Sequence, residues 1–94
     1  MKAYGTMNIL VVDDHQDMQD YLQDILSEQG YKVAKAASAD EALAKIAHNE
    51  FHLVITDIKM PGMDGVGLLN EIKSGTGFSP FVILITAFGD INDT

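Results

Sequence analysis

Leu53-Val54-Ile55-Thr56-Asp57-Ile58-Lys59-Met60-Pro61-Gly62-Met63-Asp64-Gly65 is the stretch that decides the fold of this 94-residue chain. It opens with a short apolar run that ends at Asp57, which is typical of a strand buried on both faces. The loop that follows is rich in turn residues, and Asp64 is placed to cap a helix. A buried strand, a loop and a capped helix in this order predict one unit of an α/β sheet.

The same alternation continues on both sides of this stretch. Besides Leu53–Thr56, apolar runs predict strands at Ile9–Val12, Tyr31–Ala36 and Phe81–Thr86. Helical spacing predicts helices between these strands, and each helix has a recognisable boundary signal. These signals are Gly30 after the first helix, the capping box Ser38–Glu41 and the break Asn49–Glu50 around the second, and Gly75 and Gly77 after the third.

The order β-α-β-α-β-α-β favours right-handed crossovers and a doubly wound parallel sheet with helices on both faces. Lys32 and Lys35 make the second strand half polar, so we expect that strand at an edge of the sheet. In such sheets the ligand crevice lies beyond the carboxyl ends of the strands, where the strand order reverses. The residues expected there are Asp13, Asp14, Asp57 and Thr86.

Composition excludes several classes of function. The net charge of −8, with only six basic residues, argues against direct contact with nucleic acid. The chain has no Cys, so a disulfide framework and a thiolate metal site are both excluded. No apolar run approaches the ~18 residues of a membrane span, and residues 1–5 lack the apolar core of a signal peptide. We therefore expect a cytoplasmic protein without membrane contact.

Three carboxylates follow two strands that would be neighbours. Like charges about 4 Å apart repel by about 4 kcal/mol at an effective dielectric near 20, so a cluster of Asp13, Asp14 and Asp57 needs a cation or a proton. Mg²⁺ is the hard ion that such oxygen ligands prefer. The alternative is that Asp13–Asp14 only starts a helix, because acids favour first turns. A third acid after another buried strand favours the metal site.

Three blocks of the sequence resemble the signature blocks of response regulator receiver domains, in the family's order and spacing. They are Ile9–Asp14, Leu53–Gly65 and Val82–Ala87. The resemblance implies a flavodoxin-like receiver fold with strand order 2-1-3-4 over residues 1–94. It also implies a phosphoacceptor signalling domain of a two-component system rather than an enzyme.

The resemblance implies a role for each site residue. Asp57 would take a phosphoryl group from a sensor histidine kinase. Asp14 and Asp57 would bind Mg²⁺ directly, Asp13 would act mainly through water, and the backbone carbonyl of Lys59 would be the remaining protein ligand. Thr86 would be the switch hydroxyl that bonds the phosphoryl group, and Ala87 would supply a small residue beside it.

The family pattern continues beyond this sequence, with a fifth strand that carries a Lys and a last helix. We therefore expect a receiver domain that is incomplete at its C-terminus, and self-association or element swapping through the exposed strand Phe81–Thr86. Receivers are usually joined to output domains, and Ile85–Asp90 is similar to receivers of NtrC-like transcriptional activators.

Two other functions stay open at this point: an interaction module that accepts no phosphate, and a Mg²⁺-dependent phosphohydrolase of doubly wound fold. A phosphohydrolase would place its two acids a short step apart after the first strand, whereas Asp13 and Asp14 are adjacent. His15 follows the acidic pair and is close enough in sequence to lie near the site, but a solvated position in the first helical turn is expected for it. His48 and His52 are expected to be surface residues without partners. Met60 and Met63 are expected to pack within their loop.

Overall fold

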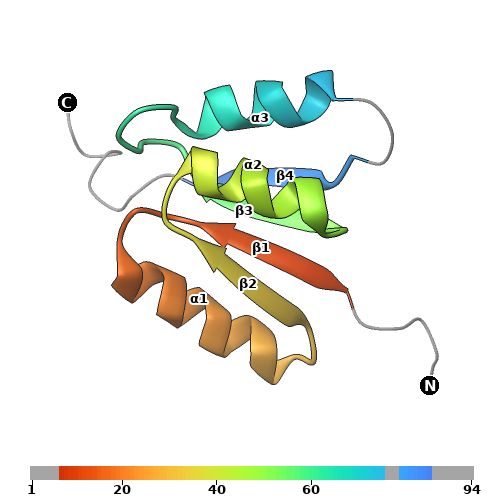
Figure 1. Ribbon diagram of the computed structural model, residues 1–94. Coiled ribbons are helices and arrows are strands. Elements are labelled where there is room, and N and C mark those ends of the chain that lie inside the picture. The colour runs from red at the N-terminus through yellow and green to blue at the C-terminus, as the bar shows by residue number, and fades with distance from the viewer. Residues whose placement is uncertain (1–6, 76–78, 86–94) are drawn as a thin grey trace.

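The computed structural model describes residues 7–75 and 79–85 (Figure 1). Strands and helices alternate along the chain, as the sequence predicts. The elements are β1 (Asn8–Val12), α1 (Gln16–Glu28), β2 (Lys32–Ala36), α2 (Ala39–His48), β3 (Leu53–Asp57), α3 (Gly65–Ser74) and β4 (Phe81–Ile85).

The strands form one sheet in the order β2-β1-β3-β4, and every pair is parallel. The chain moves from β1 outward to β2 and then crosses back to place β3 on the other side of β1. The order therefore reverses between β1 and β3, where Val12 is in register with Thr56. The predicted strand order is confirmed, and the reversal puts the carboxyl ends of β1 and β3 side by side.

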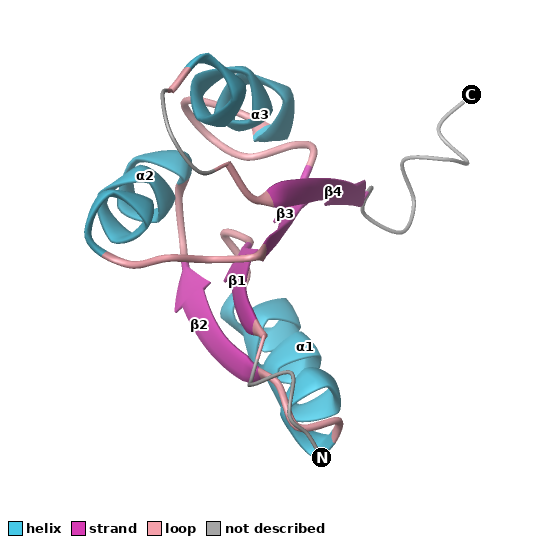
Figure 2. Cartoon of the chain, turned by 90° about the vertical axis from the view of Figure 1, so that its right-hand side faces the viewer, coloured by secondary structure: helices cyan, strands magenta, loops and turns pink. Residues whose placement is uncertain are grey.

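Helices cover both faces of the sheet: α1 lies on one face, and α2 and α3 lie on the other (Figure 2). The larger core forms under α2 and α3, where strand side chains meet the apolar faces of both helices. Met60 belongs to this core at 9% exposure, so its predicted packing role is confirmed. The buried members are Leu10, Val12, Ala36, Ala39, Ala42, Phe51, Val54, Met60, Leu68 and Ile72.

The helix ends follow the predicted capping chemistry. Ser38 Oγ accepts a hydrogen bond from Glu41 N at 3.1 Å, and the Glu41 carboxylate accepts one from Ala37 N at 2.9 Å. Gly30 ends α1 with φ +96°, a conformation that side chains disfavour, and its N–H donates to Ser27 O. Tyr31 N also donates to Leu26 O, which completes a Schellman motif.

The half-polar strand β2 lies at an edge of the sheet, as predicted. Lys35 faces α1, where its Nζ lies 2.8 Å from Asp20 Oδ1. The prediction for His52 was wrong, because its ring is half-buried and Nδ1 accepts a hydrogen bond from Asn8 N at 3.0 Å. This bond satisfies the N–H of the first residue of β1. The two residues lie 44 positions apart in the sequence, so no local pattern could indicate the contact.

Strand β4 is apolar without alternation, a pattern typical of strands buried on both faces, but one of its faces is exposed. Phe81 is 79% exposed and Ile83 is 47% exposed. The reason is that α1 packs against β2 and β1, so within the described residues the same face of β4 has no helix over it. Among those residues, no helix combines the length and apolar character needed to cross a membrane.

Candidate functional site

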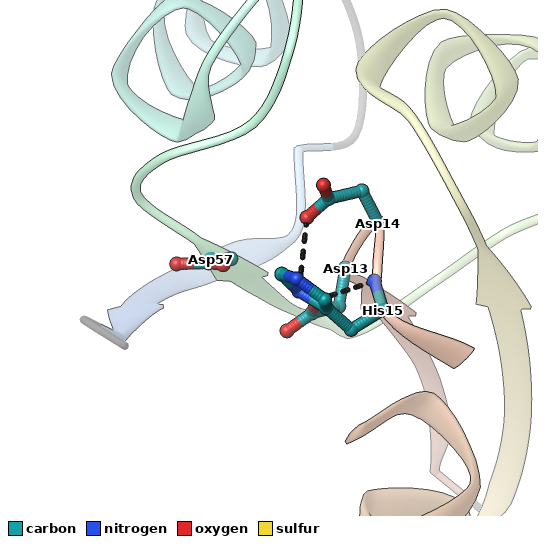
Figure 3. Close-up of side chains that lie close together, drawn as sticks. All are labelled: Asp13, Asp14, His15 and Asp57. Carbon is teal, nitrogen blue, oxygen red and sulfur yellow. Dashed lines mark hydrogen bonds and ion pairs between the residues drawn. The ribbon is translucent and has the colours of Figure 1, made fainter. Parts of the chain in front are cut away.

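The fold brings the predicted acids together at the carboxyl ends of β1 and β3. Asp57 is the last residue of β3, and Asp13 and Asp14 directly follow β1. One oxygen from each carboxylate and Nδ1 or Nε2 of His15 all lie within 4.8 Å of one another (Figure 3). The predicted cluster of Asp13, Asp14 and Asp57 is therefore present in the structure, and His15 joins it.

The cluster is partly removed from solvent. Asp13 and Asp57 are each 4% exposed, whereas the Asp14 side chain keeps 28% of its surface exposed. Burial raises the pKa of Asp57 above its ordinary value, and the charges of Asp13 and Asp14 raise it further. The N–H of Lys59 opposes these effects by donating to Asp57 Oδ1 at 3.3 Å. Asp57 is thus a poorly solvated carboxylate, and its charged form is stabilised by a nearby cation or by bonding to an electrophile.

His15 belongs to the site, although the sequence favoured a solvated first-turn position for it. Its ring is 72% exposed, as expected, but Nδ1 lies 3.2 Å from Asp13 Oδ1 and 3.3 Å from Asp14 Oδ1. The hydrogen bond to Asp13 and then the charge of Asp14 raise the pKa of His15. A histidine directly after two strand-end acids was the available signal, but the direction of its side chain depends on the turn into α1.

Gln19, on α1, holds the backbone of Asp13 in place through a hydrogen bond. Its side chain is buried at 8% exposure, and Nε2 donates to the backbone carbonyl of Asp13 at 2.7 Å. Gln19 lies three residues before Leu22 and seven before Leu26, so it falls on their face of α1. A polar residue on that helix face is the signal in the sequence that points to this contact.

Gly65 fixes the position of Asp57 in a comparable way. It starts α3 directly against the end of β3, where a Cβ atom would lie 2.3 Å from Asp57 O and 2.9 Å from Ile58 Cα. Its N–H donates to Ile58 O at 2.8 Å, and Asp64 caps the helix by accepting from Gly67 N. The lack of a side chain at Gly65 thus allows α3 to approach the backbone of Asp57.

The donor set suits a hard divalent cation. Ligand atoms about 2.1 Å from an octahedral ion lie about 3.0 Å apart when adjacent and about 4.2 Å apart when opposite, so the acid oxygens, which lie within 4.8 Å of one another, draw closer together to share one ion. Carboxylate oxygens are the ligands that Mg²⁺ prefers. Coordination by the Lys59 carbonyl stays a prediction, and the predicted roles of Thr86 and Ala87 fall on residues outside the described ranges.

Comparison with known protein families shows that the response regulator receiver domain matches residues 9–94 of this chain. The chain belongs to this family. A receiver domain is a signalling domain, and the acid cluster lies within the matched range.

Two transcriptional regulatory proteins are among the similar sequences. ZraR of Salmonella typhimurium is 40% identical over 87 residues, which cover 93% of this chain and 20% of ZraR. The C4-dicarboxylate transport regulator DctD of Rhizobium meliloti is 39% identical over 84 residues, covering 89% of this chain and 18% of DctD. The receiver chain therefore spans about a fifth of the length of these relatives.

Solved structures agree on the fold. A receiver protein from Pseudomonas putida superposes with a TM-score of 0.84 at 24% identity, over 97% of this chain and 76% of the other. TrrA of Thermotoga maritima, solved in complex with Mg(2+)-BeF, has a TM-score of 0.78 at 36% identity, over 89% of this chain and 72% of TrrA. The flavodoxin-like receiver fold predicted from the sequence is confirmed.

Proposed function

We propose that this receiver accepts a phosphoryl group on Asp57 in a Mg²⁺-dependent reaction. The observation that carries the proposal is the buried Asp57 carboxylate, whose pKa is raised and which lies beside the carboxylates of Asp13 and Asp14. An acid in this position is a poorly solvated nucleophile with oxygen ligands for a metal at its side. The solved complex of TrrA with Mg(2+)-BeF supports the same chemistry by similarity.

In the proposed reaction an Asp57 oxygen attacks the phosphorus of a phosphohistidine on a sensor histidine kinase. The new O–P bond forms as the P–N bond breaks, and the electron pair leaves with the imidazole nitrogen, which a proton from solvent neutralises. Mg²⁺ would reduce the charge on the phosphoryl oxygens. Asp14 and Asp57 would hold it, with the Lys59 carbonyl as a further ligand and Asp13 acting through water.

The Lys59 N–H orients Asp57 through its hydrogen bond to Oδ1. Thr86 would bond a phosphoryl oxygen, and Ala87 would leave room for it. The modified state then shifts an equilibrium between two conformations, which an output domain reads. The similarity to ZraR and DctD supports a cytoplasmic, NtrC-like transcriptional regulator as the parent protein.

Phosphorylation is tested by incubating the chain with acetyl phosphate and Mg²⁺ and measuring the intact mass. We expect a gain of one phosphoryl group that is absent in Asp57→Asn and absent when EDTA removes the metal. The matched control is Asp17→Asn, which removes an exposed acid in the first turn of α1 and should be labelled like the wild type. Labelling that persists in Asp57→Asn would contradict the assignment and indicate a different acceptor, whereas a wild type that gains no phosphoryl group would favour the interaction module that accepts no phosphate.

We further propose that the chain self-associates through β4. Phe81 and Ile83 present apolar surface on an edge strand, which is a template for pairing or packing with another copy. Sedimentation velocity should give an average mass that rises with concentration, and Phe81→Lys with Ile83→Lys should return it to the monomer value. Val66→Lys, at a 44% exposed apolar residue on α3, is the control that should change nothing. A wild-type monomer at all concentrations excludes this association.

A further inference from the structure

The ring of His15 lies beside the three acids, close enough to bind a metal ion together with them. His15 occupies the N-cap position of α1 with an extended backbone, φ −103° and ψ 117°, and its own N–H donates to Asp13 Oδ1 at 2.8 Å. This turn brings the ring back over the acids, so that Nδ1 is almost equally distant from one oxygen of Asp13 and one of Asp14 (Figure 3). The same nitrogen makes no hydrogen bond that caps the helix.

The position of the ring nitrogen is compatible with a shared ion. A His nitrogen and one oxygen from each of three acids fall within 4.8 Å of one another, and ligand atoms about 2.1 Å from one cation lie at most about 4.2 Å apart, so these side chains have to move closer together to share one ion. The ring is largely exposed, so a small rotation of the side chain meets little steric resistance. When the ion binds, Nδ1 exchanges its contacts with the carboxylates for a bond to the metal.

Metal ions differ in how readily they accept an imidazole nitrogen as a ligand. Mg²⁺ prefers oxygen and keeps its waters, so a neighbouring imidazole adds little to its binding. First-row ions such as Co²⁺ and Ni²⁺ accept imidazole readily, and their affinity for mixed nitrogen and oxygen sites rises along the series from Mn²⁺ to Cu²⁺. A site with three carboxylates and one reachable imidazole therefore treats the two kinds of ion differently.

We propose that His15 is an additional ligand for first-row transition ions at the acid cluster, and that it determines the metal specificity of this receiver. The inference rests on the proposed metal-binding function and adds a residue and a class of ion to it. With His15 in place the cluster binds Co²⁺ and Ni²⁺ through nitrogen and oxygen, and Mg²⁺ through oxygen alone. Metal identity at the phosphoacceptor site then depends on a residue outside the three acids.

The test compares metal binding to the wild type, His15→Ser and His48→Ser by calorimetric titration with Mg²⁺ and with Co²⁺. Serine is a favourable N-cap residue, so His15→Ser keeps the start of α1. We expect His15→Ser to lower Co²⁺ affinity by about 10-fold or more while Mg²⁺ affinity stays unchanged, a loss of the size seen when metal sites lose supporting groups. His48, an exposed residue at the end of α2, is the control for histidine on the surface and should have no effect.

A spectroscopic measurement identifies the ligand directly. Electron paramagnetic resonance of the Cu²⁺-loaded chain should show coupling to a ring nitrogen in the wild type and in His48→Ser, and none in His15→Ser. Unchanged Co²⁺ affinity in His15→Ser, or an equal loss for Co²⁺ and Mg²⁺, would overturn the inference. Failure of the wild type to bind Mg²⁺ at all would instead count against the proposed function, so the two outcomes are distinguishable.

Discussion

Asp57→Asn is expected to raise the free energy of unfolding of the metal-free chain by about 2 kcal/mol. Three carboxylates lie within 4.8 Å, and like charges at such a distance repel by about 4 kcal/mol per pair at an effective dielectric near 20, part of which proton uptake relieves. Asparagine keeps the shape of the side chain and removes its charge from a residue that is 4% exposed. Urea denaturation in EDTA, followed by circular dichroism, measures the change.

The pH dependence of this gain follows from the raised pKa of Asp57. A carboxyl group whose folded pKa exceeds its unfolded value favours the folded state below the unfolded value of about 3.9, and this contribution is lost as the pH rises through the folded value. The advantage of Asp57→Asn should therefore be absent at the acidic limit, grow between the two pKa values and stay constant above them. A gain that increases toward acid pH would contradict the sign.

Added Mg²⁺ should make the wild type more stable than Asp57→Asn, the reverse of the order expected in EDTA. An ion at 100 times its Kd stabilises the state that binds it by about 2.7 kcal/mol, and Asp57→Asn loses one of the proposed ligands. The wild type should therefore gain more than the variant when the ion is added. Asp17→Asn, which leaves the cluster intact, should follow the wild type under both conditions. Equal Mg²⁺ responses of the wild type and Asp57→Asn would exclude Asp57 as a ligand.

Gly65→Ala is the second substitution with a large expected effect. The new Cβ would lie 2.3 Å from the carbonyl oxygen of Asp57, so either α3 or the end of β3 has to shift. Overpacking of this kind costs about 1–3 kcal/mol, and here the displaced backbone carries the phosphoacceptor. We expect lower stability together with weaker Mg²⁺ binding, measured by urea denaturation and by calorimetric titration.

Gly75→Ala is the matched control for this experiment. Its Cβ would meet only Ile72 O at 3.5 Å, an ordinary contact, and its φ of −73° suits alanine. Because alanine restricts the unfolded chain, this variant should be neutral or more stable by about 0.4–1 kcal/mol. Should Gly65→Ala behave like Gly75→Ala, the close approach of α3 to Asp57 would not be a constraint on the site.

The sequence alone determined the sheet, its edge strand β2, the helix caps and the three acids of the site. These features follow from local chemistry, because the spacing of apolar residues and the turn residues define each helix and strand. Parallel strands then place their carboxyl ends at one edge of the sheet. Asp13, Asp14 and Asp57 could therefore be placed together before any contact between them was known. The capping residues Ser38 and Asp64 were predictable for the same reason.

Only the tertiary structure decided which residues surround those acids. Nδ1 of His15 reaches the cluster because of the turn into α1, Gln19 holds Asp13 because α1 packs on β1, and Gly65 touches Asp57 because α3 begins against β3. The exposure of Ile83 likewise depends on which strands α1 covers. Such contacts depend on the angles and separations of packed elements, and a pattern of residue types along one segment contains no information about either.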